Sequence, residues 1–128
     1  MDGTDALALG RRFVNALTSH DWEDLAACFS EGAGFRALVP SPANPIRDWI
    51  GRADAAGQLQ RWFEDSHVTE LVASTVEMVG DRLHVAYRIQ GHEPDGWYLI
   101  EQQTFITPGP SGIADLNLVC SGSQAIEP

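Results

Sequence analysis

The chain has 128 residues and a formal net charge of −10, and its eight basic residues are all arginines. Repulsion by this charge excludes nucleic acid and membrane surfaces as expected partners, and the lack of lysine excludes Schiff-base catalysis through a lysine amine. We expect one cytoplasmic domain spanning residues 1–128, because the first residues lack the basic start of a signal peptide and no apolar run approaches the roughly 20 residues of a membrane span.

The N-terminal segment predicts two helices. An apolar stripe at steps of three and four residues marks the first helix, formed by Ala6, Leu9, Phe13, Ala16 and Leu17. His20 interrupts this pattern, and Asp21 can cap a second helix. We expect that helix to end at Glu31–Gly32, where glycine allows a left-handed exit.

The middle of the chain predicts a small hairpin and a third helix. Gly34 to Val39 and Ile46 to Ile50 have the composition of short strands. The prolines within Pro40 to Pro45 require a loop or hairpin tip between them. Asp54 can then cap a helix that runs from Ala55 to about Asp65.

The C-terminal half predicts four long strands. They are rich in β-branched and aromatic residues, and turn residues such as Gly80–Asp81 and Pro108–Gly112 separate them. The predicted strands are Thr69 to Val79, Leu83 to Gln90, Trp97 to Thr107 and Ile113 to Cys120.

Helices followed by strands indicate the α+β class, with a curved antiparallel sheet wrapped around the N-terminal helices. Such a sheet would bury the apolar stripe of the first helix on its concave face. Helix and sheet diverge towards one end of this arrangement, so we expect a ligand cavity there.

This order of helices and strands resembles the nuclear transport factor two-like superfamily. The resemblance is carried by the start LGRRFVNALTSHDWEDLAACFSEGAGF and the end YLIEQQTFITPGPSGIADLNLVCSG. Its members include ketosteroid isomerase, scytalone dehydratase, limonene epoxide hydrolase and the SnoaL-like polyketide cyclases. The resemblance implies a cystatin-like, cone-shaped α+β barrel and a homodimer formed through the outer face of the sheet. Activity must still be argued from the site, because this fold hosts both enzymes and inert binders.

The resemblance to ketosteroid isomerase implies three positions to compare. The position of its general base matches Ala37, its oxyanion-hole tyrosine matches Phe13, and its protonated aspartate matches Gln103. Two of these groups are absent here and the third is an amide. A steroid isomerase of that design is therefore not expected, although Gln103 could still donate a hydrogen bond to an oxyanion.

Glu101, Gln102 and Gln103 place a carboxylate and two amides within an otherwise apolar strand, a conflict typical of functional sites. The family match places Gln103 in the pocket, and Glu101 shares its face, together with His84 and Arg88 on the neighbouring strand. We expect Glu101 to act as a general base or acid, since an apolar pocket disfavours its charged form. His84 would move a proton in the opposite sense, and Gln103 would hold a carbonyl or developing enolate.

Further side chains are expected to contact the substrate along the cone and at its mouth. This predicted set is Phe13, Leu17, Arg36, Trp62, Arg88, Phe105, Leu116, Leu118 and Cys120. The histidines and carboxylates do not have the spacing of a metal site, so we expect no bound metal. The proposed chemistry requires no cofactor, so we expect none. Cys28 and Cys120 are expected to be free thiols.

The opposite orientation of the strands is a second interpretation. In it, the face with Glu101 and His84 is the outer one, and it packs against a second subunit or holds cross-strand pairs. Tyr87, Ile89, Tyr98 and Ile100 would then line an apolar pocket with tyrosine hydroxyls as its polar groups.

The leading functional hypothesis is a small cofactor-independent enzyme in secondary metabolism. It would act as an isomerase, dehydratase or polyketide cyclase on a small hydrophobic molecule. The alternative is a non-catalytic module for small-molecule binding or dimerisation, or an accessory subunit that binds another protein through a strand edge.

Overall fold

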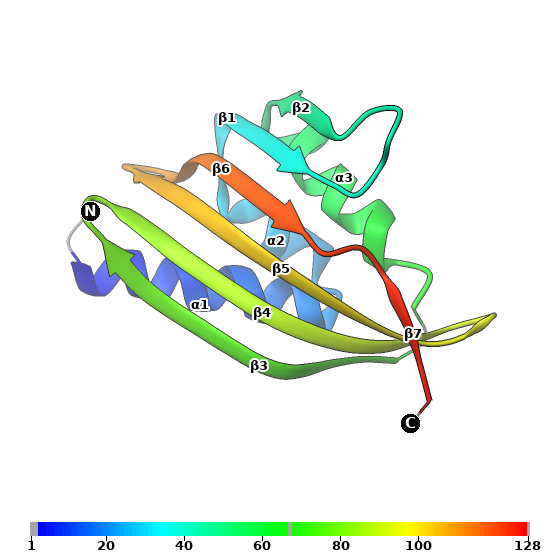
Figure 1. The fold of residues 1–128 in the computed structure, drawn as a ribbon. Helices are drawn as coiled ribbons and strands as arrows, with labels where there is room; N and C mark the ends of the chain where they lie inside the picture. Colours follow the sequence, from blue (N-terminus) through cyan, green and yellow to red (C-terminus); the bar gives the residue numbers. More distant parts are fainter. Residues whose placement is uncertain (1–2, 67, 128) are drawn as a thin grey trace.

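The chain folds into three helices and one curved sheet, shown in Figure 1 as a computed structural model that describes residues 3–66 and 68–127. The helices are α1 (Gly3–Ser19), α2 (Trp22–Ala27) and α3 (Arg52–Phe63). The strands are β1 (Phe29–Leu38), β2 (Ile46–Ile50), β3 (Val68–Val79), β4 (Arg82–Glu93), β5 (Gly96–Gly109), β6 (Gly112–Cys120) and β7 (Gln124–Ile126). This arrangement confirms the predicted α+β class.

Helix α1 buries the apolar stripe that the sequence predicted, and Phe13 and Leu17 are completely enclosed. Gly10 lets the helix approach the sheet closely. A Cβ atom at this position would lie only 2.7 Å from Cγ1 of Val76 on β3. The close packing of α1 against the β3–β4 side of the sheet therefore requires glycine at position 10.

Helix α2 begins as predicted and ends earlier. The Asp21 side chain accepts a hydrogen bond from the Asp24 N–H over 3.1 Å, which satisfies a donor in the first helical turn. The predicted end at Gly32 is wrong, since the helix ends at Ala27. The physical reason is that Phe29 already belongs to β1 and is completely buried in the core.

Helix α3 also begins earlier than the predicted cap at Asp54. Its N-cap is Gly51, which has a φ of 100°, a conformation that glycine adopts more easily than other residues. Asp54 instead lies in the first turn, where an acidic side chain interacts favourably with the helix dipole.

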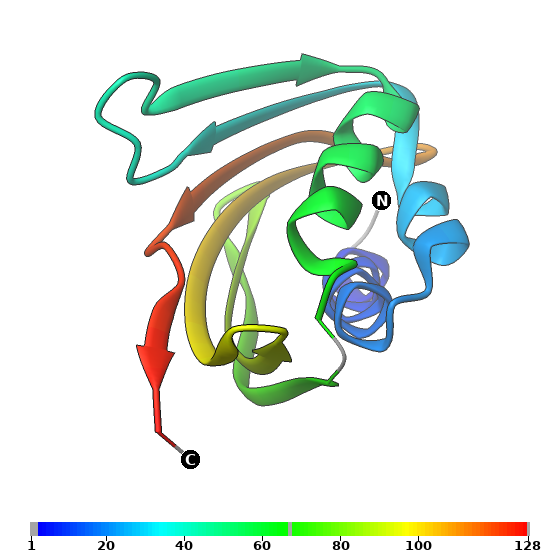
Figure 2. The same ribbon diagram turned by 90° about the vertical axis from the view of Figure 1, so that its right-hand side faces the viewer.

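The sheet is mixed rather than entirely antiparallel as predicted. Its strand order is β2-β1-β6-β5-β4-β3, and β7 pairs with β5. All neighbours are antiparallel except β1 and β6, which run parallel. Figure 2 shows the sheet curving around the helices, which lie on one side of it. We call that side of the sheet the inner face and the opposite side the outer face.

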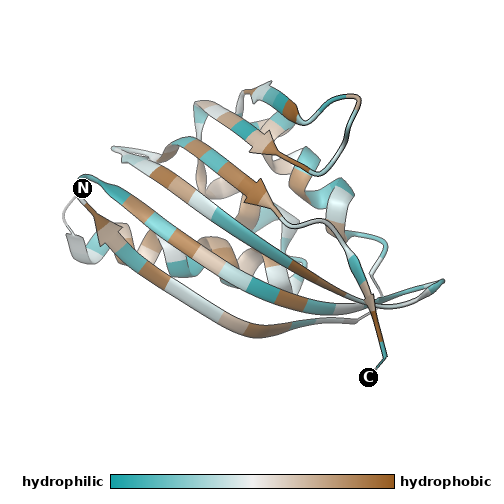
Figure 3. Cartoon of the chain, viewed as in Figure 1, coloured by the Kyte–Doolittle hydropathy of each residue, from teal (hydrophilic) through white to brown (hydrophobic). Residues whose placement is uncertain are grey.

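Hydropathy alternates along the strands, as Figure 3 shows, because successive side chains point to opposite faces. On β4 the alternation is unambiguous. The inner-face residues of this strand are Leu83, Val85, Tyr87 and Ile89, and all four are buried.

The pairing of β5 with β4 determines which of the β5 residues face the helices. Val85 pairs with Thr104, and Tyr87 pairs with Gln102. Residues that pair directly point to the same face of a sheet. The even-numbered residues of β5 therefore lie on the inner face with the buried residues of β4, and the odd-numbered ones lie on the outer face. The register shift between β5 and β6 lies next to their turn, where Ala114 is the extra residue on β6.

Candidate functional site

Glu101 and Gln103, the predicted acid or base and its hydrogen-bonding neighbour, lie on the outer face of β5. The Glu101 side chain is 47% exposed and accepts a hydrogen bond from Nη2 of Arg88 over 3.1 Å. The expected orientation into the cone is therefore wrong. The physical reason is the register of β5, which places Gln102 and Thr104 on the inner face instead.

His84 joins this outer-face group. Its Nε2 lies 3.1 Å from Oε1 of Gln103, and its Nδ1 lies 3.1 Å from Oε1 of Glu77. The imidazole also packs on Phe105, with 5.0 Å between the ring centroids. The structure thus brings the predicted acid–base residues together, but on the face turned away from the helices.

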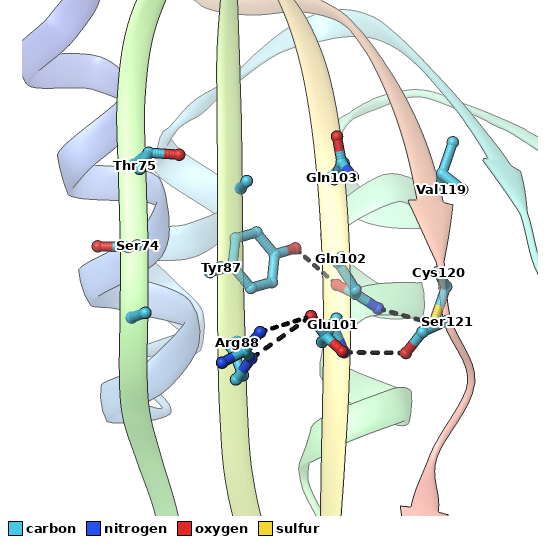
Figure 4. A pocket seen from close by; sticks show the side chains of 12 residues that line it. Ser74, Thr75, Tyr87, Arg88, Glu101, Gln102, Gln103, Val119, Cys120 and Ser121 are labelled. Carbon is cyan, nitrogen blue, oxygen red and sulfur yellow. Dashed lines mark hydrogen bonds and ion pairs between the residues drawn. The ribbon is translucent and has the colours of Figure 1, made fainter.

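A shallow groove of about 440 Å³ runs over this part of the outer face. Figure 4 shows it from outside the sheet, with the Arg88–Glu101 pair, Gln103 and Val119 around it. The groove is open to water, so Glu101 is paired with Arg88 across two strands in solvent rather than isolated in an apolar pocket.

The other predicted substrate-contacting residues are divided between the two faces. Arg36 lies on the outer face of β1, where its Nε is 2.7 Å from Oδ1 of Asp48, and Phe105 and Arg88 lie on the same face. Trp62 is half-buried on α3. The members completely or almost completely buried among the helices and the inner face are Phe13, Leu17, Leu116 and Leu118.

The inner face carries a chain of hydrogen bonds across three strands. The Tyr87 hydroxyl on β4 donates to Oε1 of Gln102 on β5 over 2.6 Å. Nε2 of Gln102 in turn donates to Sγ of Cys120 on β6 over 3.3 Å, and the Gly122 N–H approaches the same sulfur at 3.4 Å. Figure 4 shows this chain behind the groove. We call Tyr87, Gln102 and Cys120 the inner polar chain.

Burial changes the acid–base properties of the inner tyrosine. Tyr87 is enclosed by the core, and desolvation raises the pKa of its phenol well above the usual value. Gln102 is only 1% exposed. The inner polar chain is thus built around a neutral phenol and a neutral amide, which suits hydrogen-bond donation to an oxygen rather than removal of a proton.

Three further buried hydroxyl groups are satisfied within the fold. The Tyr98 and Ser66 hydroxyls are 2.6 Å apart, and Thr104 Oγ1 donates to the Val85 carbonyl over 2.9 Å. Burial is the main cause that raises the pKa of Tyr98. These hydroxyls are bonded to oxygen atoms, whereas the Gln102 amide donates to sulfur, a weaker acceptor that a ligand oxygen can replace more easily.

An aromatic cluster closes the β2 end of the inner face. The rings of Phe35 and Trp49 are 4.8 Å apart between centroids, and Trp62 meets both rings edge-on at 6.0 and 5.9 Å. Phe35 is buried, whereas Trp49 and Trp62 are half-buried. The cluster therefore forms an apolar wall that still reaches the surface.

In the part of the chain that the structure describes, no three His, Cys, Asp or Glu side chains are placed to hold a metal ion. Within the same part, no helix is both long and apolar enough to cross a membrane.

Comparison with known proteins places this architecture in a family. The SnoaL-like domain family matches residues 10–112, which is most of the chain. The chain belongs to the SnoaL-like domain family. No curated protein is similar enough in sequence to match.

Solved structures with this SnoaL-like architecture are similar over most of their length. A candidate polyketide cyclase from Xanthomonas campestris pv. campestris is 24% identical, with a TM-score of 0.70 over 89% of this chain and 88% of that one. A candidate isomerase from Bacillus subtilis is 16% identical, with a TM-score of 0.78 over 94% and 90%. A protein of ketosteroid isomerase-like fold from Catenulispora acidiphila, in complex with trimethylamine, is 12% identical, with a TM-score of 0.68 over 86% and 82%. At these identities the likeness establishes the fold alone.

Sequence reasoning from the family match missed Gln102 as the inner amide of this SnoaL-like chain. The signal was present in β4, because the apolar Leu83, Val85 and Ile89 predict the inner face and Tyr87 lies in the same series. Gln102 pairs directly with Tyr87 across the strands. Following that pairing, instead of the matched position of Gln103, would have identified the inner polar chain.

Proposed function

We propose that this SnoaL-like protein binds a small, mostly apolar molecule that carries a carbonyl oxygen, on the inner face of its sheet. In this proposal the Gln102 amide donates a hydrogen bond to that oxygen, and the Tyr87 hydroxyl orients the amide. The observation that carries the proposal is the inner polar chain, a polar row across strands whose other inner-face residues are mostly apolar.

The hydrogen bond from Gln102 to Cys120 is the one that a ligand can replace. A thiol sulfur is a weak acceptor, so its exchange for a carbonyl oxygen improves the hydrogen bond of the amide. By contrast, the Gln102 carbonyl is already held by a short bond from Tyr87, which fixes the direction in which the N–H groups point. The bond from Tyr87 thus holds the Gln102 amide in place, while its bond to Cys120 can be exchanged for one to a ligand.

The same geometry supports chemistry on the carbonyl. A positioned amide N–H stabilises the negative charge that develops on oxygen when a ketone becomes an enolate. This is the step that isomerisations and aldol-type cyclisations share, and the similar structures from Xanthomonas campestris and Bacillus subtilis are named as candidate members of such enzyme classes. Small-molecule recognition is therefore proposed as the function, with enolate stabilisation as its catalytic form.

A matched pair of probes tests the binding proposal. 2-Acetylnaphthalene carries the carbonyl, and 2-ethylnaphthalene has nearly the same shape without it. We expect the ketone to bind about five- to tenfold more tightly, which corresponds to one net hydrogen bond of about 1 kcal/mol. Gln102→Met should remove this preference and leave the affinity for 2-ethylnaphthalene nearly unchanged, as measured by titration calorimetry. Equal affinity of the unmodified protein for both probes contradicts the proposal.

A second candidate function keeps the acid–base residues predicted from the sequence. Glu101, Gln103 and Arg88 line the outer groove, and His84 is hydrogen-bonded to Gln103 beside it. A substrate in this groove would meet a carboxylate and an imidazole within one cluster. Once a substrate has been found, loss of turnover in both Glu101→Gln and His84→Gln, with unchanged turnover in Gln102→Met, would favour this function over the first.

The outer face also supports the proposal of a homodimer. Ile46, Leu38 and Val119 are Cα partners across β2, β1 and β6, and their exposed fractions are 56%, 45% and 46%. Burial of such a row against a second subunit would be favourable. Sedimentation equilibrium should show a dimer that Val119→Glu dissociates; a monomer at all concentrations is the contrary result.

A further inference from the structure

Arg47 is a cationic side chain on the inner edge of the sheet that the fold itself does not explain. It pairs with Ala37 across the antiparallel β2–β1 ladder, so both side chains lie on the same face. Ala37 is completely buried, and Trp49, two residues along β2, packs on Phe35 and Trp62. Arg47 therefore extends from β2 on the side of the helices, next to the aromatic cluster.

One nitrogen of the half-buried Arg47 side chain lacks a hydrogen-bond partner in the described structure. Its Nε is buried and has no hydrogen-bond partner among residues 3–66 and 68–127. The neighbouring carboxylate of Asp48 is on the opposite face, where it pairs with Arg36. A buried N–H group without an acceptor is costly, so the Nε atom of Arg47 indicates an acceptor that the chain alone does not supply.

The strand pairing gives the distance between Arg47 and the strand that carries Gln102. Ala37 pairs with Leu118 on β6, and Leu118 pairs with Thr104 on β5, two residues from Gln102. Three strand spacings of about 4.8 Å thus separate the backbone of Arg47 from that of β5, roughly 14 Å in total. The aromatic cluster lies at the Arg47 end of this span.

We propose that Arg47 binds a carboxylate of the ligand, at the end opposite to the carbonyl held by Gln102. This inference rests on the proposed function and narrows its substrate class to an elongated aromatic or polycyclic keto acid. The planar guanidinium matches a carboxylate in geometry, and Trp49 and Trp62 provide an apolar wall for the rings between the two polar ends.

The negative net charge of the protein supports the assignment of the ligand carboxylate to one particular arginine. A formal net charge of −10 repels an anionic ligand, so a preference for the acid over its neutral analogue requires a local cation. Among the arginines, Arg12, Arg36 and Arg88 already form ion pairs with carboxylates. Arg47 is the arginine that combines an inner-face position with a buried, unpartnered nitrogen.

The test uses 6-acetyl-2-naphthoic acid and 2-acetylnaphthalene, which differ in the carboxylate alone. In titration calorimetry with the full chain, the acid should bind about 10- to 100-fold more tightly than the ketone, as expected for charge-assisted hydrogen bonds. Arg47→Met should remove this advantage and leave the affinity for 2-acetylnaphthalene unchanged. Arg36→Met is the matched control, because it removes the same charge from the other face of the same hairpin, and it should preserve the advantage.

Thermal unfolding of the free protein provides a second measurement. Arg47→Met should unfold at the same or a higher temperature, because it removes a desolvated donor and keeps an apolar side chain of similar length. Arg47→Lys, which keeps the charge, should retain part of the preference for the acid. A clearly lower unfolding temperature of Arg47→Met would assign the side chain to fold stability and overturn the inference.

The binding results also separate this inference from the proposed function. If Gln102→Met weakens ketone binding but the acid binds no better than the ketone, Arg47 does not hold a carboxylate and the carbonyl site stands. If the acid binds through Arg47 but Gln102→Met changes neither affinity, the anion site stands and the carbonyl site is wrong. If neither probe binds, both are wrong.

Discussion

The Tyr87 hydroxyl donates a hydrogen bond to Oε1 of Gln102 over 2.6 Å, between the inner faces of β4 and β5. The two residues are Cα partners, so the bond crosses the shortest path between adjacent strands. It fixes the amide in an orientation that sends its N–H groups towards β6. The candidate site depends on this pair, because the hydroxyl determines what the amide can offer.

Loss of the Tyr87 hydroxyl should destabilise the protein. Tyr87→Phe leaves Oε1 of Gln102 buried without a donor, which costs about 1–3 kcal/mol of unfolding free energy. Adding Gln102→Met removes the orphaned acceptor, so the double variant should recover part of this loss. Urea unfolding of the unmodified protein, the two single variants and the double variant measures the coupling between Tyr87 and Gln102. Strictly additive losses of unfolding free energy would argue against this coupling.

Neutralising Glu101 should have little effect on stability. Its carboxylate and the Arg88 guanidinium are each about half exposed, and exposed pairs contribute at most about 1 kcal/mol. Glu101→Gln is therefore expected to shift the unfolding free energy by less than that amount. A large gain in stability would instead indicate a carboxylate strained for function, and would support the second candidate function.

The close approach of α1 to the sheet can be tested with two glycines. Gly10→Ala would bring a methyl group to 2.7 Å from Val76 and 3.2 Å from Val85, so we expect a loss of about 1–3 kcal/mol. Gly57→Ala in α3 meets no atom closer than 3.8 Å and should stabilise by about 0.5–1 kcal/mol. Thermal unfolding measures both, and effects of the same sign would contradict the packing described for α1.

The two thiols should differ in reactivity. Burial raises the pKa of Cys28 to about 11, so almost none of it is thiolate at pH 8, whereas Cys120 is only partly buried. Ellman's reagent should therefore modify the native protein slowly and through Cys120, and Cys120→Ser should abolish this reaction. Fast modification of Cys28 in the native state would be inconsistent with its enclosure.

The same burial of Cys28 predicts a dependence of stability on pH. Its folded-state pKa of about 11 lies above the ordinary 9.0, so the unfolded chain releases this proton first as pH rises. The stabilising contribution is present below pH 9 and is lost between about pH 9 and 11. Cys28→Ala should flatten the fall in urea midpoint over that interval, compared with the unmodified chain.

The sequence by itself determined the helical stripe of α1, the cap at Asp21 and the four long strands, because these follow from local periodicity and capping chemistry. It also predicted that Leu116 and Leu118 are buried, as they are. What it could not determine was the face of Glu101. Both faces of β5 have polar residues within an apolar pattern, so the strand alone gives no preference.

Only the tertiary structure decided that question. The β4–β5 ladder pairs Tyr87 with Gln102 and Arg88 with Glu101, and this register places Glu101 on the outer face. A register different by one residue would exchange the two faces. Likewise, Arg47 lies on the inner face because β2 pairs with β1, a contact set by the register of the hairpin. Periodicity assigns residues to elements, whereas the pairing between elements decides which side chains meet, since that depends on hydrogen bonds between distant segments.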